Sequence, residues 1–212
     1  MEKCQLTYAF GALCGWCYGF APALHRFAAD NADRIRLQVL SGGLFTGHAA
    51  GPLSAYPHIP DANHRIAQLT GVRFGEQYRQ VLSEGSLVMD STAPAMGLAA
   101  LRRQAPERAL ELAGAIQEAW YQHGQDLRES GVYRSIAVAR GLDAAALTSD
   151  WADPGLRAEV QEEFQSVRRL GVHQYPTLLL HTPAGPRRLG GPVSTADVLT
   201  EALDSHIATT TP

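Results

Sequence analysis

The chain has 212 residues, of which 45% are hydrophobic and 18% are charged. This composition supports a buried core and excludes a disordered chain. Its 18 basic and 21 acidic residues nearly balance, so no broad positive surface is available for nucleic acid or an anionic membrane. No run approaches the roughly 18 apolar residues of a membrane span, and residues 1–4 lead into a strand pattern without a signal-peptide core. We therefore expect a cytoplasmic protein with neither a nucleic-acid nor a membrane partner.

The first expected elements are a strand, a helix and a second strand. Residues 6–10 form a short, mostly apolar and β-prone run. Apolar side chains then recur at helical spacing from Cys17 to about Asp30, and Pro22 is expected to kink this helix. Residues 35–40 alternate apolar and polar side chains and end at a glycine loop, which predicts the second strand.

Helices dominate the region that follows. Three kinds of residue set the expected bounds of these helices. They are aspartates that accept backbone N–H groups, prolines that fit a first helical turn, and glycines that end helices. The expected helices run from Asp61 to Gly71, over 74–82, from Pro106 to Gly124, from Asp143 onward, and from Asp153-Pro154 to Gly171.

The last part of the chain returns to strands. The compact apolar run at 177–180, a proline and glycine turn, and residues 187–189 predict a hairpin. Ser194 is expected to cap a final helix, with Asp197 near its positive end. The resulting order is β-α-β, a helical block of roughly 100 residues, then β-β-α, which indicates a helical subdomain inserted into a small α/β unit.

Two cysteines one helical turn apart, in Cys14-Gly15-Trp16-Cys17, lie between the first strand and the first helix. Three cysteines are too few for a secreted disulfide framework, and a structural zinc site needs four ligands, so the pair indicates redox chemistry. A helix N-terminus favours a thiolate, the form that attacks disulfides. We expect Cys14 to be the nucleophile, with a pKa below the free value of about 8.5, and Cys17 to be the shielded resolving thiol. Trp16 either tunes the pair or covers apolar surface.

These features resemble the DsbA-like branch of the thioredoxin superfamily, in which a helical domain interrupts a thioredoxin fold. The resemblance rests on the cysteine motif, on Pro22 five residues after Cys17, and on the sequence Gly-Val-His-Gln-Tyr-Pro-Thr at 171–177. Residues 13–19 are similar to those of cytoplasmic bacterial members identified as protein-disulfide isomerases. The resemblance implies an α/β thioredoxin fold with an inserted all-helical subdomain. The implied domains are the thioredoxin fold, at 1–55 and 172–212, and the inserted helices, at 56–171.

The resemblance also implies a substrate-binding set of Trp16, Tyr175 and Pro176. The proline is cis in that family and would present the backbone of Tyr175 to an extended substrate. Relatives often carry Asp-Pro where this chain has Gly11-Ala12, and Thr or Val where it has Tyr175. The lost carboxylate bears on the thiolate pKa, and the bulky tyrosine either narrows the substrate groove or contacts substrate.

Two further residues carry weaker signals. His173 lies in the expected active-site loop, where it could assist proton transfer or bind a metal. Cys4, at the far end of the first strand, is interpreted as a small core residue.

The leading hypothesis is a thiol–disulfide oxidoreductase, acting as an oxidase, reductase or isomerase through a mixed disulfide formed by Cys14 and resolved by Cys17. It needs no metal or organic cofactor, and its partners are protein or peptide thiols and disulfides, glutathione as a co-substrate, or a thioredoxin-like protein. One alternative is a glutathione-dependent enzyme of the kappa-class transferase or hydroxychromene carboxylate isomerase type, whose members usually have serine at the position of Cys14. Another is a Cu(I) carrier using Cys14, Cys17 and His173.

Overall fold

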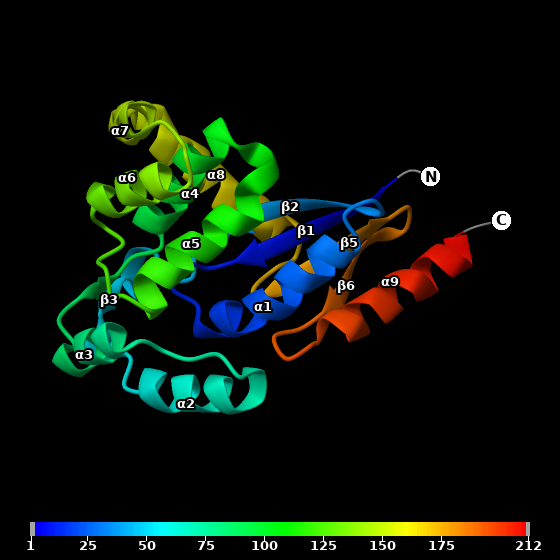
Figure 1. Cartoon of the computed structure of the whole chain (residues 1–212), viewed down its shortest axis with the longest axis horizontal. Coiled ribbons are helices and arrows are strands. Elements are labelled where there is room, and N and C mark those ends of the chain that lie inside the picture. The colour runs from blue at the N-terminus through cyan, green and yellow to red at the C-terminus, as the bar shows by residue number, and fades with distance from the viewer. Residues whose placement is uncertain (1–2, 211–212) are drawn as a thin grey trace.

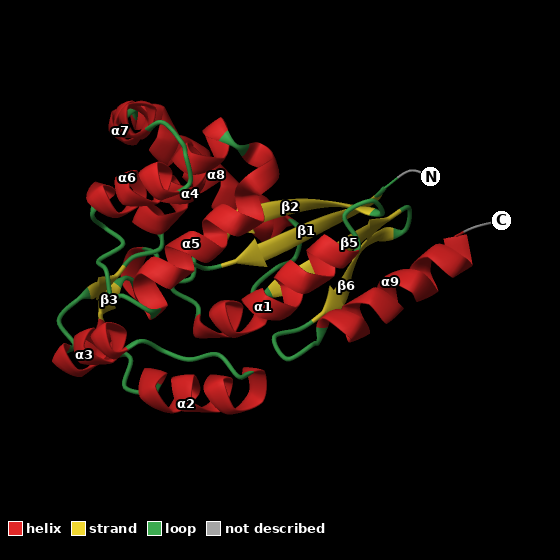
Figure 2. Cartoon of the chain, in the orientation of Figure 1, coloured by secondary structure: helices red, strands yellow, loops and turns green. Residues whose placement is uncertain are grey.

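A mixed four-stranded sheet forms the centre of the computed structural model, which describes residues 3–210 (Figures 1 and 2). The strands are β1 (Cys4–Phe10), β2 (Ile35–Ser41), β5 (Thr177–Thr182) and β6 (Gly185–Gly190), in the order β2-β1-β5-β6. The pair β1 and β2 is parallel, whereas β5 runs antiparallel to both β1 and β6. The predicted strand pair and hairpin are therefore confirmed.

Helices pack on both faces of this sheet. Alternation along β1 turns Tyr8 toward Phe20 of α1 (Gly15–Asp30), whereas Ala9 packs with Val167 of α8 (Pro154–Arg169). The last helix, α9 (Ala196–Thr210), lies beside α1 (Figure 1). Pro22 lies inside α1 and does not end it.

The remaining helices follow β2 and gather largely at one end of the molecule (Figure 1). They are α2 (Ile59–Thr70), α3 (Glu76–Glu84), α4 (Thr92–Gln104), α5 (Ala109–Tyr121), α6 (Ser130–Ala139) and α7 (Ala144–Ala152), followed by α8. A small second sheet pairs β3 (Gly51–Pro52) with β4 (Val88–Met89). Because α8 contacts both β2 and α4, the sheet and the inserted helices share a core. The predicted domain boundaries at 55/56 and 171/172 stay a prediction.

Several predicted helix ends are confirmed. Gly71 and Gly171 have φ values of 76° and 74° in the left-handed region that glycine adopts without strain. The carboxylate of Asp143 accepts the N–H groups of two residues in the first turn of α7, and that of Asp153 accepts one from the first turn of α8. These ends depend on the residue types at the ends themselves, which can be read directly from the sequence.

Two predicted N-caps are wrong. Helix α2 begins at Ile59, because Pro60 fits the first turn of the helix, and Asp61 therefore lies inside that turn. At α9 the capping hydroxyl belongs to Thr195, whose Oγ1 accepts the Val198 N–H at 3.3 Å. Ser194 instead accepts the N–H of Gly191 and closes the preceding turn.

The predicted extents of other helices also needed correction. Pro106 opens a short 3₁₀ turn, Pro106–Arg108, after which α5 runs only to Tyr121 rather than to Gly124. Phe74 precedes α3 instead of lying in it. The sequence patterns did not identify α4 or α6. No helix within residues 3–210 combines the length and apolar character required to cross a membrane.

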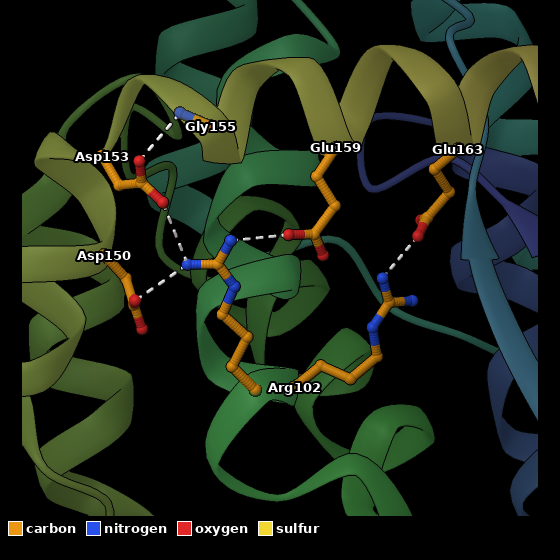
Figure 3. Close-up of polar contacts among 7 residues, drawn as sticks. Arg102, Asp150, Asp153, Gly155, Glu159 and Glu163 are labelled. Atoms are coloured by element: carbon orange, nitrogen blue, oxygen red, sulfur yellow. Dashed lines mark hydrogen bonds and ion pairs between the residues drawn. The ribbon is translucent and has the colours of Figure 1, made fainter.

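A partly buried ion pair joins α4 and α8 close to the sheet (Figure 3). Arg102 contacts Glu163, and the two side chains are only 19% and 10% exposed. Arg102 also donates to the carbonyl of Val39 at 2.6 Å, and Glu163 accepts the N–H of Ser41 at 2.6 Å. Both partners of the pair are thus bound to the backbone of β2.

We predict that Glu163→Gln lowers the free energy of unfolding by about 1.5–3 kcal/mol, because it leaves the partly buried Arg102 charge without a carboxylate. Glu159, one turn earlier on α8, provides the control: it pairs with Arg103 at 2.7 Å, but the two side chains are 41% and 33% exposed. Glu159→Gln should therefore cost less than about 1 kcal/mol. Chemical denaturation measures both, and equal effects of the two variants would contradict the prediction.

Candidate active site

The cysteine motif lies immediately after the central strand. Chain reversal at residues 11–13 is closed by a hydrogen bond from the Cys14 N–H to the Gly11 carbonyl at 3.1 Å, and α1 begins at Gly15. Because α1 follows β1 so closely, the start of α1 lies at the end of the sheet. Cys14 occupies the N-cap position, with φ −94° and ψ 110°, rather than the first turn of the helix.

The sulfur of Cys14 caps this helix. Its Sγ accepts the backbone N–H of Cys17 at 3.4 Å, and the same N–H also donates to the Cys14 carbonyl at 3.0 Å. The pKa of the Cys14 thiol is lowered. The largest cause is a hydrogen bond from the Cys17 thiol, and burial opposes it. Cys14 is buried, with 6% of the residue exposed.

Cys17 lies one turn inside and is fully buried. The N–H of Gly11 donates to its Sγ at 3.4 Å. Burial raises the pKa of the Cys17 thiol well above its ordinary value, and the neighbouring Cys14 raises it further. Both cysteines are free thiols in this structure. The pair therefore combines one activated thiol with one protected thiol.

The register between β1 and β5 brings the second predicted segment to the motif. Ala9 pairs with Thr177, so the residues just before β5 lie beside the residues just after β1. The thiol of Cys14 donates to the carbonyl of Tyr175 at 3.5 Å, and the peptide bond between Tyr175 and Pro176 is cis. Cys14, Cys17, Tyr175 and Pro176 thus form one site from opposite ends of the chain.

The ring of Tyr175 lies against the loop that follows β2. A Cβ atom on Gly42 would come within 2.1 Å of Cε1 and Cζ of that ring. The ring is half-buried, and this burial raises the pKa of the phenol. Glycine at position 42 therefore provides the space that a tyrosine, in place of a smaller residue, requires.

The structure also places Trp16, His173 and Cys4, the other residues singled out in the sequence. Trp16, in the first turn of α1, is half-buried and packs against the core. His173 is exposed, and half-buried Cys4 begins β1, at the end of the strand opposite the motif. Across residues 3–210, no group of three or more His, Cys, Asp or Glu side chains is placed to hold a metal ion. Cys14, Cys17 and His173 consequently do not form the three-ligand copper site considered above.

The sequence patterns did not indicate that two buried tyrosines lie near the dithiol. Tyr8 lies on β1 and Tyr121 at the end of α5, with exposures of 2% and 1%. The charges of Cys14 and Cys17 raise the pKa of each phenol beyond the larger effect of burial. The alternation of side chains along β1 could have predicted that Tyr8 faces the first helix, because Tyr8 and Phe10 share the face that meets α1.

Comparisons with known proteins agree with this geometry. Residues 6–194 match the family model of the DSBA-like thioredoxin domain. The match confirms the resemblance drawn from the motifs and, together with the observed elements, the predicted fold class. No curated protein matches the sequence significantly.

Three solved proteins illustrate the structural similarity. A Nitrosomonas europaea protein provisionally named a protein disulfide isomerase has a TM-score of 0.86 and 22% identity, covering 99% of this chain and 100% of its own. The cytosolic disulfide reductase DsbM from Pseudomonas aeruginosa has a TM-score of 0.80 and 27% identity, with coverage of 97% and 99%. Its structure with GSH has a TM-score of 0.77 and 28% identity, with coverage of 96% and 99%. A 2-hydroxychromene-2-carboxylate isomerase shares the fold, with a TM-score of 0.61, 14% identity, and coverage of 97% and 95%.

We predict that alkylation of Cys14 has a pH midpoint below the value of about 8.5 for a free cysteine. Because the hydrogen bond from Cys17 is the largest cause of the lowered pKa, Cys17→Ala should move this midpoint upward. Alkylation by iodoacetamide across a pH series, read by mass spectrometry in a Cys4→Ser background, measures both. A midpoint at or above the free value, or one that Cys17→Ala leaves in place, would contradict the prediction.

We also predict that Gly42→Ala lowers the free energy of unfolding by about 1–3 kcal/mol, because the added methyl group displaces the Tyr175 ring. In a Tyr175→Val background the same change should cost much less, so the two substitutions are non-additive. Gly131→Ala is the control, since a Cβ atom there meets nothing within 4 Å. Additive effects of Gly42→Ala and Tyr175→Val in denaturation measurements would show that the contact carries no energy.

Proposed function

We propose that this chain, which belongs to the DSBA-like thioredoxin domain family, is a thiol–disulfide oxidoreductase that works as a disulfide reductase. The observation that carries the proposal is the arrangement of Cys14. Its sulfur caps α1, its pKa is lowered, and it lies 3.5 Å from the Tyr175 carbonyl that precedes Pro176. A thiolate placed beside the backbone that leads into β5 is suited to attack the disulfide of a bound peptide.

The reaction uses the two thiols in sequence. The Cys14 thiolate attacks one sulfur of the substrate disulfide, which breaks the substrate S–S bond, forms a mixed disulfide and releases the first substrate thiolate. Cys17 then loses its proton and attacks Cys14 Sγ. The bond between Cys14 and the substrate breaks, the Cys14–Cys17 disulfide forms, and the second substrate thiolate departs and takes up a proton. Two electrons have passed from the dithiol to the substrate.

We propose glutathione as the source of these electrons. Support comes from DsbM, the 27–28% identical disulfide reductase that was also solved with GSH. One glutathione thiolate would open the Cys14–Cys17 disulfide and form a mixed disulfide on Cys14. A second would attack that mixed disulfide, restore the Cys14 thiolate and leave as oxidised glutathione. The description of DsbM as cytosolic likewise supports a cytoplasmic location for this chain.

The two rival functions differ in what they require of Cys17. A glutathione-dependent transferase or isomerase needs one activated group near glutathione and has no use for a resolving thiol. A Cu(I) carrier would need both sulfurs to remain reduced and bound to metal. The isomerase neighbour, at 14% identity, supports the shared fold only. A resolving role for Cys17 therefore separates the proposed function from both rivals.

We expect the purified protein to reduce insulin with glutathione as electron donor, as measured by insulin precipitation and by formation of oxidised glutathione. Cys14→Ser should lower the rate to that without protein. Cys17→Ser should instead accumulate a mixed disulfide on Cys14, detected by mass spectrometry. Cys4→Ser is the control and should retain activity, because Cys4 lies at the opposite end of β1.

Two outcomes would overturn the proposal. One is a wild-type protein that fails to reduce insulin while Cys17→Ser retains glutathione conjugation or isomerisation. The other is protein, purified without a chelating column, that holds stoichiometric copper on Cys14 and Cys17 and lacks exchange activity.

A further inference from the structure

Arg188 of β6 connects the edge of the sheet to the segment proposed to bind the substrate. Its guanidinium donates from Nη2 to the Pro176 carbonyl at 3.2 Å and from Nε to the Gly190 carbonyl at 3.0 Å. Pro176 follows Tyr175, whose carbonyl accepts the Cys14 thiol. The arginine therefore contacts the residue next to the one that contacts the nucleophile.

A β-bulge lies beside this contact. Arg188 pairs with Leu179, but the next pair joins Gly190 with Leu178, so Leu189 is an extra residue in β6. Bulges bend a strand and re-aim its side chains, and they are frequent next to active sites. Here the extra residue is buried, whereas the arginine before it is exposed and its guanidinium reaches the cis-proline. The irregular end of β6 and the start of β5 thus meet at this side chain.

The positive charge of Arg188 has no carboxylate partner among residues 3–210. Both of its hydrogen bonds go to neutral carbonyl oxygens, and Nη1 takes part in neither. Because the residue is exposed, the planar guanidinium keeps N–H groups for a further acceptor from solution. A carboxylate is the acceptor that such a fork binds best, through parallel charge-assisted hydrogen bonds.

A second arginine adds positive charge near the same segment. Arg168 is exposed in the last turn of α8. Burial raises the pKa of the Tyr175 phenol, and the charge of Arg168 opposes that rise. The other charges that act on this phenol belong to Cys17 and Cys14. Outside the dithiol itself, the charge near the segment is therefore positive.

The activation of Cys14, by contrast, comes from donors close to it. A hydrogen bond from the Cys17 thiol is the largest cause of its lowered pKa, burial opposes it, and the backbone N–H groups of Cys17 and Trp16 lower the pKa further. Loss of the charge at position 188 should therefore leave thiolate formation in place and change the recognition of the substrate.

We propose that Arg188 is a specificity-determining residue that favours disulfide substrates with an acidic side chain next to the reactive cysteine. This inference rests on the proposed function. A substrate that pairs with the backbone of Tyr175 places the neighbours of its cysteine along the segment at Pro176. A carboxylate there accepts hydrogen bonds from the guanidinium while the Cys14 thiolate attacks the substrate sulfur. The carboxylate only binds, so the bonds and protons that change remain those of the two-thiol reaction.

The test measures the reaction of reduced protein with three symmetrical peptide disulfides, with no glutathione present. Each half is a tripeptide with blocked ends and a central cysteine, flanked on both sides by Glu, Gln or Lys. Because the blocked ends carry no charge, the peptides differ only in the flanking side chains. Second-order rate constants come from acid-quenched samples analysed by mass spectrometry. Each peptide is compared between protein variants, so its intrinsic reactivity cancels.

We expect wild-type protein to prefer the Glu peptide, and Arg188→Gln to lower the Glu-to-Gln ratio of rate constants about fivefold, as two exposed charges about 4 Å apart in water imply. Arg188→Lys keeps the charge and should retain most of the preference. Salt at about 1 M should reduce the wild-type preference by screening. The pH midpoint of Cys14 alkylation should stay the same in every variant, which also reports that each one is folded.

Arg187→Gln is the matched control. Arg187 precedes Arg188 on β6 and is also exposed, but it pairs with Leu180 in the regular part of the ladder, before the bulge. The substitution removes the same charge from the neighbouring position and leaves the contact with Pro176 in place. It should keep the wild-type ratios.

Four outcomes would contradict these claims. Wild-type protein without a preference for the Glu peptide, or a preference that survives Arg188→Gln, overturns the inference. An equal fall in Arg187→Gln does the same, because it assigns the preference to the general charge of β6. Equal slowing of all three peptides by Arg188→Gln would show that the arginine only supports the cis-proline segment. Wild-type protein that reacts with none of the peptides, although Cys14 can be alkylated, overturns the proposed function itself.

Discussion

The hydrogen bond from the Cys17 N–H to Cys14 Sγ, at 3.4 Å, is the interaction on which the arrangement of the site depends. A side-chain acceptor at an N-cap reaches the N–H group three residues later, so this bond places the second cysteine one turn inside the helix. The intervening Gly15 has little room for a side chain: a Cβ atom there would lie 2.9 Å from Ile66. Helix α2 can therefore pack closely against the start of α1.

The same geometry separates the properties of two identical side chains. Cys14 Sγ has the thiol and the backbone N–H of Cys17 as donors, and both lower its pKa. Cys17 has one N–H donor from Gly11, but it is fully buried, and burial outweighs that donor and raises its pKa. The order of reaction proposed for the pair follows from position along one helical turn.

The features that could be predicted from the sequence are those that depend on residues close together along the chain. Helix ends at Gly71 and Gly171 and the cap at Asp143 required only local chemistry. Helix α4 was not recognised because nine of its thirteen residues, Thr92 and Pro94–Leu101, are buried, so it lacks the polar face that marks an amphipathic helix. The contact between Gly42 and Tyr175 depends on the register of β1 with β5, which periodicity does not set. Tyr8 was assigned to the correct strand, but its contact with Phe20 depends on how α1 packs on that strand.

The inserted helices reach the substrate side of the site through the loop after β2. Glu163 of α8 binds Arg102 of α4 and also accepts the N–H of Ser41, while the next N–H, of Gly42, donates to Phe10 at the end of β1. This loop is thus held by the helical insertion on one side and by the central strand on the other. The ring of Tyr175 rests on Gly42, and the Tyr175 carbonyl accepts the Cys14 thiol. A continuous series of direct contacts consequently runs from α4 and α8 to Tyr175, so packing within the insertion helps to position the segment proposed to bind the substrate.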